Sequence, residues 1–261
     1  MVYVAHHKKI RRPSLFLTMT DANGALVNRV TLPMVAPFLS SSPKGDGHPV
    51  LVLPPLGGDD GTTKSLRNFL QKSGYHSHSW QLGKNLFRKT IGENGEKLFA
   101  RLEQIYESSG TQVSIVGWSL GGSIAREVAR RRPELVRQVI TLGSGINGST
   151  SVLNNFKQYI RIVGGPVDEE AAKDIRFPPP GIPCTSIFTK TDGIIAWENC
   201  LELPGEKSDN IEVVSSHTGL GWSAPAYYAI LDRLIQTKEN WKPFSRTGLR
   251  KLFFPSSGHN Y

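Results

Sequence analysis

The sequence has few cysteines and no long hydrophobic run. Only two of its 261 residues are cysteines, Cys184 and Cys200, and they form neither a metal-binding pattern nor a disulfide framework. Cys184 is expected in the core of a strand, and a bridge between the two cysteines stays open. No apolar run approaches the roughly 18 residues of a membrane-spanning helix. We therefore expect no disulfide-stapled scaffold, no metal site and no membrane-spanning helix.

Recognisable targeting signals are also missing. The basic N-terminus carries only a short apolar stretch, residues 15–17, which is far too short for the hydrophobic region of a secretory signal, and no small-residue cleavage site follows it. We therefore expect a cytoplasmic protein. The sequence has no internal repeat and no sign of a second domain, and its length suits one domain with a full hydrophobic core.

Acidic residues are fewer than basic ones. The chain has 22 Asp and Glu against 31 Lys and Arg, which gives a net charge of +9. The basic residues gather at residues 8–12, 130–132 and 242–251. Such charge attracts polyanions or an anionic membrane surface, but it also serves solubility, and the sequence favours the second interpretation. Because no nucleic-acid-binding motif accompanies the charge, we expect no nucleic-acid partner and at most weak contact with an anionic membrane surface.

Short apolar runs alternate with amphipathic stretches between residues 48 and 240. Continuous apolar runs are typical of buried parallel strands, and apolar residues at helical spacing indicate helices that cover the sheet. We expect strands at residues 50–53, 75–80, 112–116, 136–142, 184–188 and 211–214, and helices at residues 63–73, 95–109, 226–235 and directly after Ser119. The alternation predicts an α/β fold, a mostly parallel sheet with helices on both faces.

Two flanking segments stand apart from this domain. Residues 1–47 are expected to form an N-terminal arm and a leading segment, loose to about Arg12, with a helix near residues 26–39 that two prolines break. Residues 241–261 are expected to form a basic C-terminal tail.

An insert interrupts the alternation at residues 147–180. It contains two helical stretches, and its apolar face includes Phe156 and Tyr159. One interpretation is a small helical lid over the site, in which these two residues contact the substrate. The other is an ordinary crossover connection padded by apolar residues, and both stay open.

The most informative motif is G-x-S-x-G at residues 117–121, which follows a predicted strand and begins a predicted helix. Glycines on both sides of Ser119 allow a tight, strained turn that lifts the serine hydroxyl clear of the backbone. The helix that begins there directs free N–H groups toward the same point. The motif therefore predicts that Ser119 is a nucleophile.

A nucleophilic serine needs a base, and the base needs an acid that orients it. Asp192 and His217 each follow a predicted strand, and the carboxyl ends of parallel strands meet at one edge of the sheet. The other histidines lie in the arm, in the tail, along a strand or at the opposite edge, and Asp168 in the insert is the reserve acid. We therefore expect Ser119, Asp192 and His217 to converge.

Acyl chemistry also needs N–H donors for the developing oxyanion. The backbone N–H of Leu120, directly after the serine, is the first candidate. The loop after the first strand should supply the second, and Leu56 fits because the preceding Pro54 and Pro55 have no N–H. Gly57 is the alternative in the same loop.

With these residues in place, the sequence resembles α/β-hydrolases of the lipase and esterase group over residues 48–238. The resemblance is most specific in residues 116–122, 191–197 and 216–220. It implies an eight-stranded sheet or a trimmed version of it, a Ser–His–Asp triad, acyl-ester substrates and no cofactor. The chain departs from the group in its Pro-Pro oxyanion loop, where lipases often have His-Gly, and in having no visible signal sequence.

The residues and the resemblance together predict a serine hydrolase that cleaves a small-molecule carboxylic ester through an acyl-enzyme. Apolar residues in the insert suggest a lipophilic acyl chain. Trp118 is expected to pack beside the nucleophile, with a place in the acyl pocket as the alternative. Acyl transfer or thioester cleavage by the same triad is one rival function, and a catalytically silent protein that binds lipid or an anionic partner is the other.

Overall fold

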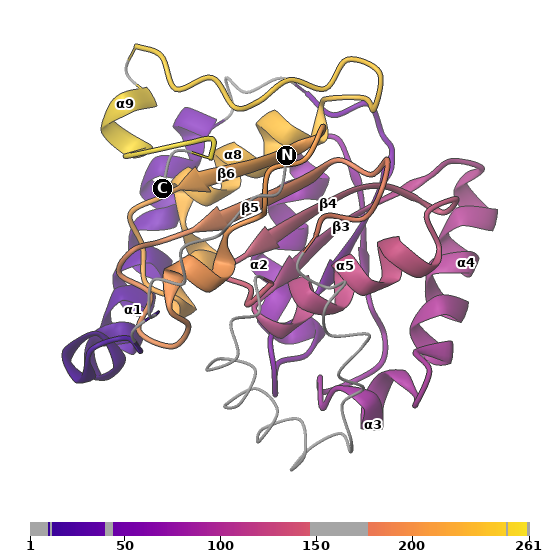
Figure 1. Ribbon diagram of the computed structural model, residues 1–261, viewed down its shortest axis with the longest axis horizontal. Coiled ribbons are helices and arrows are strands. Elements are labelled where there is room, and N and C mark those ends of the chain that lie inside the picture. The colour runs from indigo at the N-terminus through magenta and orange to yellow at the C-terminus, as the bar shows by residue number, and fades with distance from the viewer. Residues whose placement is uncertain (1–9, 11, 40–43, 147–176, 249, 260–261) are drawn as a thin grey trace, which may run out of the picture.

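The computed structural model describes residue 10 and residues 12–39, 44–146, 177–248 and 250–259. Its centre is a parallel sheet of six strands in the order β2-β1-β3-β4-β5-β6 (Figure 1). The strands are β1 Pro49–Leu53, β2 His76–Ser79, β3 Val113–Trp118, β4 Val136–Leu142, β5 Cys184–Phe188 and β6 Ser208–Glu212. The predicted mostly parallel α/β sheet is confirmed, in a trimmed version.

Helices cover both faces of this sheet, as Figure 1 shows. They are α1 Leu15–Leu39, α2 Asp60–Lys72, α3 Arg88–Ile91, α4 Glu96–Ser109, α5 Leu120–Arg131, α8 Ala224–Leu234 and α9 Arg250–Phe253, with short 3-10 helices η1 Trp197–Cys200 and η2 Thr218–Trp222. One core layer joins α2, α8 and η2 to the sheet, and the other joins α4 and α5 to the opposite face. Each central strand therefore buries apolar side chains on both faces, which explains the continuous apolar runs in the sequence.

The strand order places the β3–α5 turn at the centre of one sheet edge. The chain passes from β1 outward to β2 and then returns to β3 on the other side of β1, so connections leave in opposite directions around β1 and β3. At such a switch point the loops after neighbouring strands diverge and leave a crevice at the carboxyl edge of the sheet. The G-x-S-x-G motif lies at this carboxyl edge, beside the switch point.

The last strand begins earlier than the sequence predicts. We expected it at residues 211–214, but β6 spans Ser208–Glu212, so Asp209 lies inside the strand rather than before it. Its polar residues are buried with partners: an Asp209 carboxylate oxygen accepts a hydrogen bond from the Phe244 N–H, and the Asn210 side-chain amide donates to the Glu202 carbonyl. The prediction was wrong because tertiary hydrogen bonds, invisible in the local pattern, satisfy these groups.

The leading segment differs most from expectation. Helix α1 is continuous from Leu15 to Leu39, although we expected it to begin near residue 26 and to break at Pro33 and Pro37. Three buried residues, Asp21, Ala25 and Leu32, attach it to the rest of the molecule. Packing of this one side favours a helix where local propensity alone predicts an interruption.

Part of the segment expected as a tail also packs on the domain. Phe244 and Phe254 are buried in the core layer that contains α8, and their rings lie 4.7 Å apart. His259 lies within hydrogen-bonding distance of the Asn210 side chain in β6.

Cys184 lies in β5 and Cys200 in η1, and both are buried free thiols. Among the helices of the described residues, none combines the length and the apolar character needed to cross a bilayer.

Candidate active site

Ser119 lies in a sharp turn between β3 and α5. Its backbone takes φ 52° and ψ −120°, a conformation that side chains rarely adopt outside strained turns. The flanking glycines are required by close packing: a Cβ on Gly117 would lie 2.4 Å from the Gly121 carbonyl oxygen, and one on Gly121 would lie 2.5 Å from that of Leu53. The turn therefore needs glycine at both positions of the motif.

The structure brings the three predicted triad residues together. His217 Nε2 lies 3.0 Å from Ser119 Oγ, and His217 Nδ1 lies 2.7 Å from Asp192 Oδ2. All three residues are largely buried, with Ser119 retaining 9% exposure. With the ring neutral, Nδ1–H donates to the carboxylate and Nε2 accepts from the serine hydroxyl, which is the arrangement that a general base requires.

Asp192 is held by its own loop. Its Oδ1 accepts hydrogen bonds from the backbone N–H groups of Ile194 and Ile195, at 2.9 and 2.7 Å. These bonds orient the carboxylate and leave Oδ2 to His217. A Cβ on Gly143, at the end of β4, would lie 3.2 Å from His217 Nδ1, so the ring packs directly against this backbone.

Trp118 holds the backbone of the His217 segment by a hydrogen bond. It is buried, its Nε1–H donates to the His217 carbonyl at 3.3 Å, and its ring meets that of Trp222 edge to face at 5.4 Å. These are the contacts of the packing residue that we expected beside the nucleophile. The other two predicted substrate contacts, Phe156 and Tyr159, and the reserve acid Asp168 lie outside the described residues.

The loop predicted to supply an oxyanion donor is held by Asn85, a buried residue that sequence reasoning missed. Its carbonyl accepts from Gly57 N–H at 2.8 Å and its side-chain amide donates to the Pro54 carbonyl at 2.7 Å. Gly57, the alternative donor, is therefore engaged. Among the described residues no partner is found for the Leu56 N–H, and the Leu120 N–H, at the first position of α5, has no acceptor inside its helix.

A second missed residue, Asp21 of α1, holds the loops of both the acid and the base. Its Oδ1 accepts from the backbone N–H of His217 at 2.8 Å and of Gly193 at 3.3 Å, and its Oδ2 accepts from that of Thr218 at 2.9 Å. Its own carbonyl accepts from the Ser216 hydroxyl at 2.8 Å. Asp21 is the single acidic residue in α1, but nothing in the local pattern indicates which distant groups its carboxylate accepts from.

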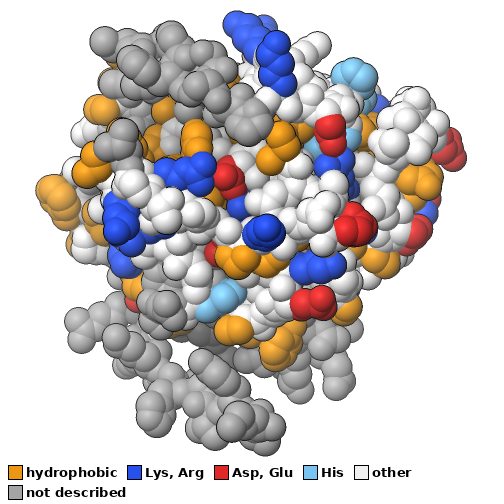
Figure 2. All heavy atoms as spheres, turned by 90° about the horizontal axis from the view of Figure 1, so that it is seen from above, with side chains coloured by type: hydrophobic (Ala, Val, Ile, Leu, Met, Phe, Trp, Pro, Cys, Tyr) orange, Lys and Arg blue, Asp and Glu red, His pale blue; other side chains and the backbone are white. Residues whose placement is uncertain are grey.

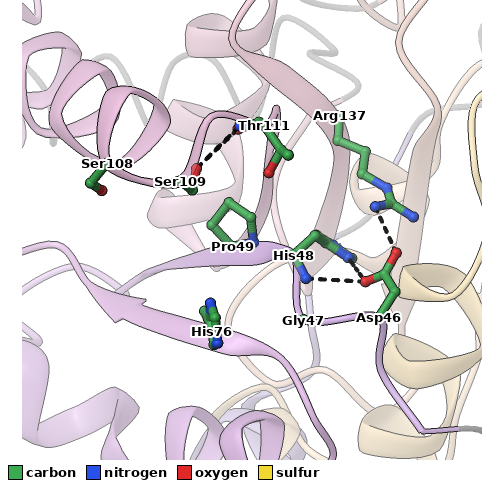
Figure 3. Close-up of a pocket in the computed structure, with 9 residues that line it drawn as sticks. All are labelled: Asp46, Gly47, His48, Pro49, His76, Ser108, Ser109, Thr111 and Arg137. Atoms are coloured by element: carbon green, nitrogen blue, oxygen red, sulfur yellow. Dashed lines mark hydrogen bonds and ion pairs between the residues drawn. The ribbon is translucent and has the colours of Figure 1, made fainter.

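Another Ser–His–Asp contact lies at the opposite edge of the sheet. His48 Nε2 lies 2.8 Å from Ser114 Oγ, and His48 Nδ1 contacts Asp46. Figure 3 shows Asp46 between His48 and Arg137, beside a cavity of about 420 Å³. Burial lowers the pKa of His48, and its hydrogen bond with Asp46 only partly offsets this. Burial would raise the pKa of Asp46, but its hydrogen bonds with His48 and Arg137 lower it to about 2.

Basic and acidic side chains are interspersed on the face of the molecule that Figure 2 draws. On the face drawn in Figure 2, Lys and Arg side chains lie scattered among Asp and Glu rather than gathered in one patch. Within the described part of the chain, no cluster of His, Cys, Asp and Glu is arranged to hold a metal ion.

No protein-family model matches the sequence, and no curated protein sequence is significantly similar to it. Solved structures do match. The monoacylglycerol lipase of Paleococcus ferrophilus matches with a TM-score of 0.53 and 16% identity, over 74% of this chain and 96% of that one. Lipase B of Aspergillus fumigatus matches with a TM-score of 0.55 and 17% identity, over 76% of this chain and 55% of that one.

The mature lipase BlEst2 of Bacillus licheniformis matches with a TM-score of 0.51 and 16% identity, over 74% of this chain and 93% of that one. At such identities the likeness concerns the fold and leaves the reaction to be argued from the site. The parallel sheet, the strand–turn–helix at Ser119 and these structural matches agree: the chain has the α/β-hydrolase fold.

Proposed function

We propose that this protein is a serine hydrolase that cleaves carboxylic esters through an acyl-enzyme. The observation that carries the proposal is the continuous series of contacts from Ser119 Oγ through the His217 ring to Asp192, at a strained turn that begins a helix. A serine activated in this way, with N–H groups nearby that have no other acceptor among the described residues, is suited to attack on an ester carbonyl.

In the first half of the reaction, Ser119 Oγ attacks the carbonyl carbon while His217 Nε2 takes the hydroxyl proton. Asp192 keeps the ring in the required tautomer and stabilises the imidazolium. The oxyanion of the tetrahedral intermediate accepts hydrogen bonds from the Leu56 and Leu120 N–H groups. When the intermediate collapses, His217 protonates the leaving alcohol and the acyl group stays on Ser119.

In the second half, water repeats the attack. His217 takes a proton from the water, which attacks the acyl-enzyme carbonyl, and then returns the proton to Ser119 Oγ as the carboxylic acid leaves. No cofactor takes part. The lipase names of the structural matches support an ester as the substrate class, and the acyl-chain length is left to experiment.

A fluorophosphonate probe tests the proposal, because it labels only an activated serine. We expect the wild-type protein and Ser114→Ala to be labelled and Ser119→Ala to remain unlabelled. Ser114 is the matched control, since it lies on β3, the strand that leads to Ser119, and also contacts a histidine. Equal labelling of Ser119→Ala and wild type, or no labelling of the wild type, would contradict the proposal.

Nitrophenyl esters of rising chain length then define the acyl preference. We expect hydrolysis by the wild type and only background rates with Ser119→Ala. A protein that is labelled by the probe but hydrolyses none of these esters would instead favour the rival chemistry on the same serine, thioester cleavage or acyl transfer to another acceptor.

A further inference from the structure

Helix α1 presents a wide apolar surface to solvent. Its outer side carries six large exposed apolar residues, Leu15, Phe16, Met19, Leu26, Val27 and Val30, with exposures from 59% to 82%. At about 100° per residue these positions fall within one continuous arc of the helix. We call this set the α1 apolar face. Figure 1 shows α1 at the outer edge of the molecule, on the side away from α4.

The inner side of the same helix packs on the domain. Asp21, Ala25 and Leu32 are buried there, and the Asp21 carboxylate holds the backbone of the His217 segment. The Asn28 side-chain amide donates to the Ser215 hydroxyl at 2.7 Å. Because these contacts prevent α1 from turning over, the α1 apolar face cannot be buried by rotation of the helix. A contiguous apolar surface of this kind marks an interaction site.

The charges beside the α1 apolar face are positive. The single acidic residue of α1 is the buried Asp21. Arg29 and Lys64 line a cavity of about 580 Å³ between α1, α2 and η2, together with Trp222, and its described lining contains no carboxylate. The guanidinium of Arg29 lies 5.7 Å from the centre of the Trp222 ring. Neither Arg29 nor Lys64 forms an ion pair with a described residue.

These observations distinguish between two candidates for covering the α1 apolar face: a second copy of the chain and a lipid surface. A second copy of the chain that docks symmetrically through α1 would bring two positively charged surfaces together, which is unfavourable. An anionic phospholipid surface offers an acyl region that can bury the apolar side chains and negatively charged headgroups that attract the cations. We propose that α1 docks on anionic phospholipid bilayers, with the α1 apolar face at the acyl boundary and Arg29 and Lys64 on the headgroups.

Vesicle flotation with the full chain tests this docking. We expect binding to vesicles of phosphatidylcholine with 30% phosphatidylglycerol, weak binding to pure phosphatidylcholine, and loss of binding as salt rises. Phe16→Ser/Met19→Ser should weaken binding about tenfold or more, because it removes two side chains from the acyl boundary. Arg29→Gln/Lys64→Gln should weaken it about fivefold for each cation removed.

The matched control is Leu252→Ser/Phe253→Ser, which removes two similarly exposed apolar side chains from α9. It should bind as the wild type does. All four proteins should share one melting temperature, and fluorophosphonate labelling should be unchanged, so that failure of docking is separate from failure of the proposed chemistry. Equal flotation of Phe16→Ser/Met19→Ser and wild type overturns the proposal. So does equal binding to neutral and anionic vesicles, or a stable dimer in solution that Phe16→Ser/Met19→Ser dissociates.

Discussion

Strand β3 has a serine near each end, and each serine contacts a histidine that contacts an aspartate. At the carboxyl end, Ser119 meets His217; at the amino end, Ser114 meets His48. The Oγ–Nε2 distances are 3.0 and 2.8 Å, so hydrogen-bond length does not tell the two groups apart. Their surroundings do.

Ser114 lies within a strand and has no exposed surface. Its backbone pairs in register with Val50 on β1 and Gln138 on β4, so its neighbouring N–H groups face the sheet ladder. Ser119 instead lies just past the strand, at positive φ, at the first turn of α5. Ser119 therefore lies outside the strand ladder and keeps some exposed surface, whereas Ser114 has none.

A catalytic serine of the kind that we propose requires more than its two partners. It needs a backbone that leaves the sheet, N–H donors aimed at the reacting oxygen, and an approach for the substrate. At the amino edge the same three residue types make a structural group, in which burial favours a neutral His48.

The largest difference in activity should be between variants of the two serines. We expect Ser119→Ala to lower kcat/KM for a nitrophenyl ester by about 10⁵-fold, because it removes the attacking atom. Ser114→Ala should leave kcat/KM within about twofold and reduce the free energy of unfolding by about 1 kcal/mol, since it removes one buried hydrogen bond. Steady-state kinetics and urea unfolding measure the two quantities. A large loss of activity in Ser114→Ala without unfolding would reverse our assignment.

The next largest difference should be between the kcat values of Asp192→Asn and Asp46→Asn. Asp192→Asn should lower kcat by about 10⁴-fold, because an amide neither selects the required tautomer nor stabilises the imidazolium. Asp46→Asn should leave kcat unchanged and lower the unfolding free energy, because it weakens the contacts with His48 and Arg137. If Asp46→Asn were the inactive variant and Asp192→Asn the active one, the amino edge would be the reactive site.

Asp21 lies outside the Ser119–His217–Asp192 series and holds its backbone, and its removal should have an intermediate effect. Asp21→Ala leaves three backbone N–H groups without their acceptor, so we expect kcat to fall about 10²-fold as His217 loses its position, with little change in KM. The kcat of Asp21→Asn should fall less, because the carbonyl oxygen of the asparagine side chain can still accept two of these hydrogen bonds.

Asn23→Ala, on the exposed side of α1, is the control for Asp21 and should behave as the wild type. Separate kcat and KM values distinguish positioning of the base from general destabilisation. A fall in melting temperature with unchanged kcat would assign Asp21 a purely structural role.

The smallest effect concerns pH and stability. The pKa of His48 is lower in the folded protein than its usual 6.5, so the unfolded chain binds more protons in the window just below that value. Folding stability should therefore decrease as pH falls from 7 through 6.5 and below. As the pH is lowered from 8 to 5, the melting temperature of the wild type should fall by a few degrees. This slope should flatten in His48→Gln, for which we expect unchanged hydrolysis of a nitrophenyl ester. An unchanged slope in His48→Gln would exclude His48 as the source.

Most of the sheet was predictable from the sequence because its central strands are rich in apolar residues and are bounded by turn residues. Strands β4 and β5 match the predicted ranges, and α4 begins one residue from its expected start. Strand β6 was misplaced because Asp209 and Asn210 are polar residues whose partners, Phe244 and Glu202, come from other parts of the chain. Polarity in the local pattern carries no record of such partners.

The convergence of Ser119, Asp192 and His217 was predictable for a different reason. Each residue follows a parallel strand, and parallel strands end at one edge of their sheet. Asp21 and Asn85 were not predictable, because both act on backbone groups, and backbone groups are the same in every residue. Their contacts with His217 and Gly57 exist only after distant segments have packed.

The order of strands and helices, the strained turn at Ser119 and the convergence of Asp192 and His217 on it were set by the sequence itself, through hydrophobic periodicity and the steric demands of glycine. Tertiary packing alone decided that α1 runs unbroken, that Asp21 holds the backbone around His217, and that Ser114 is fully buried. The physical reason is that side-chain periodicity is a local property, whereas burial and the pairing of backbone hydrogen-bonding groups depend on segments far apart in the chain.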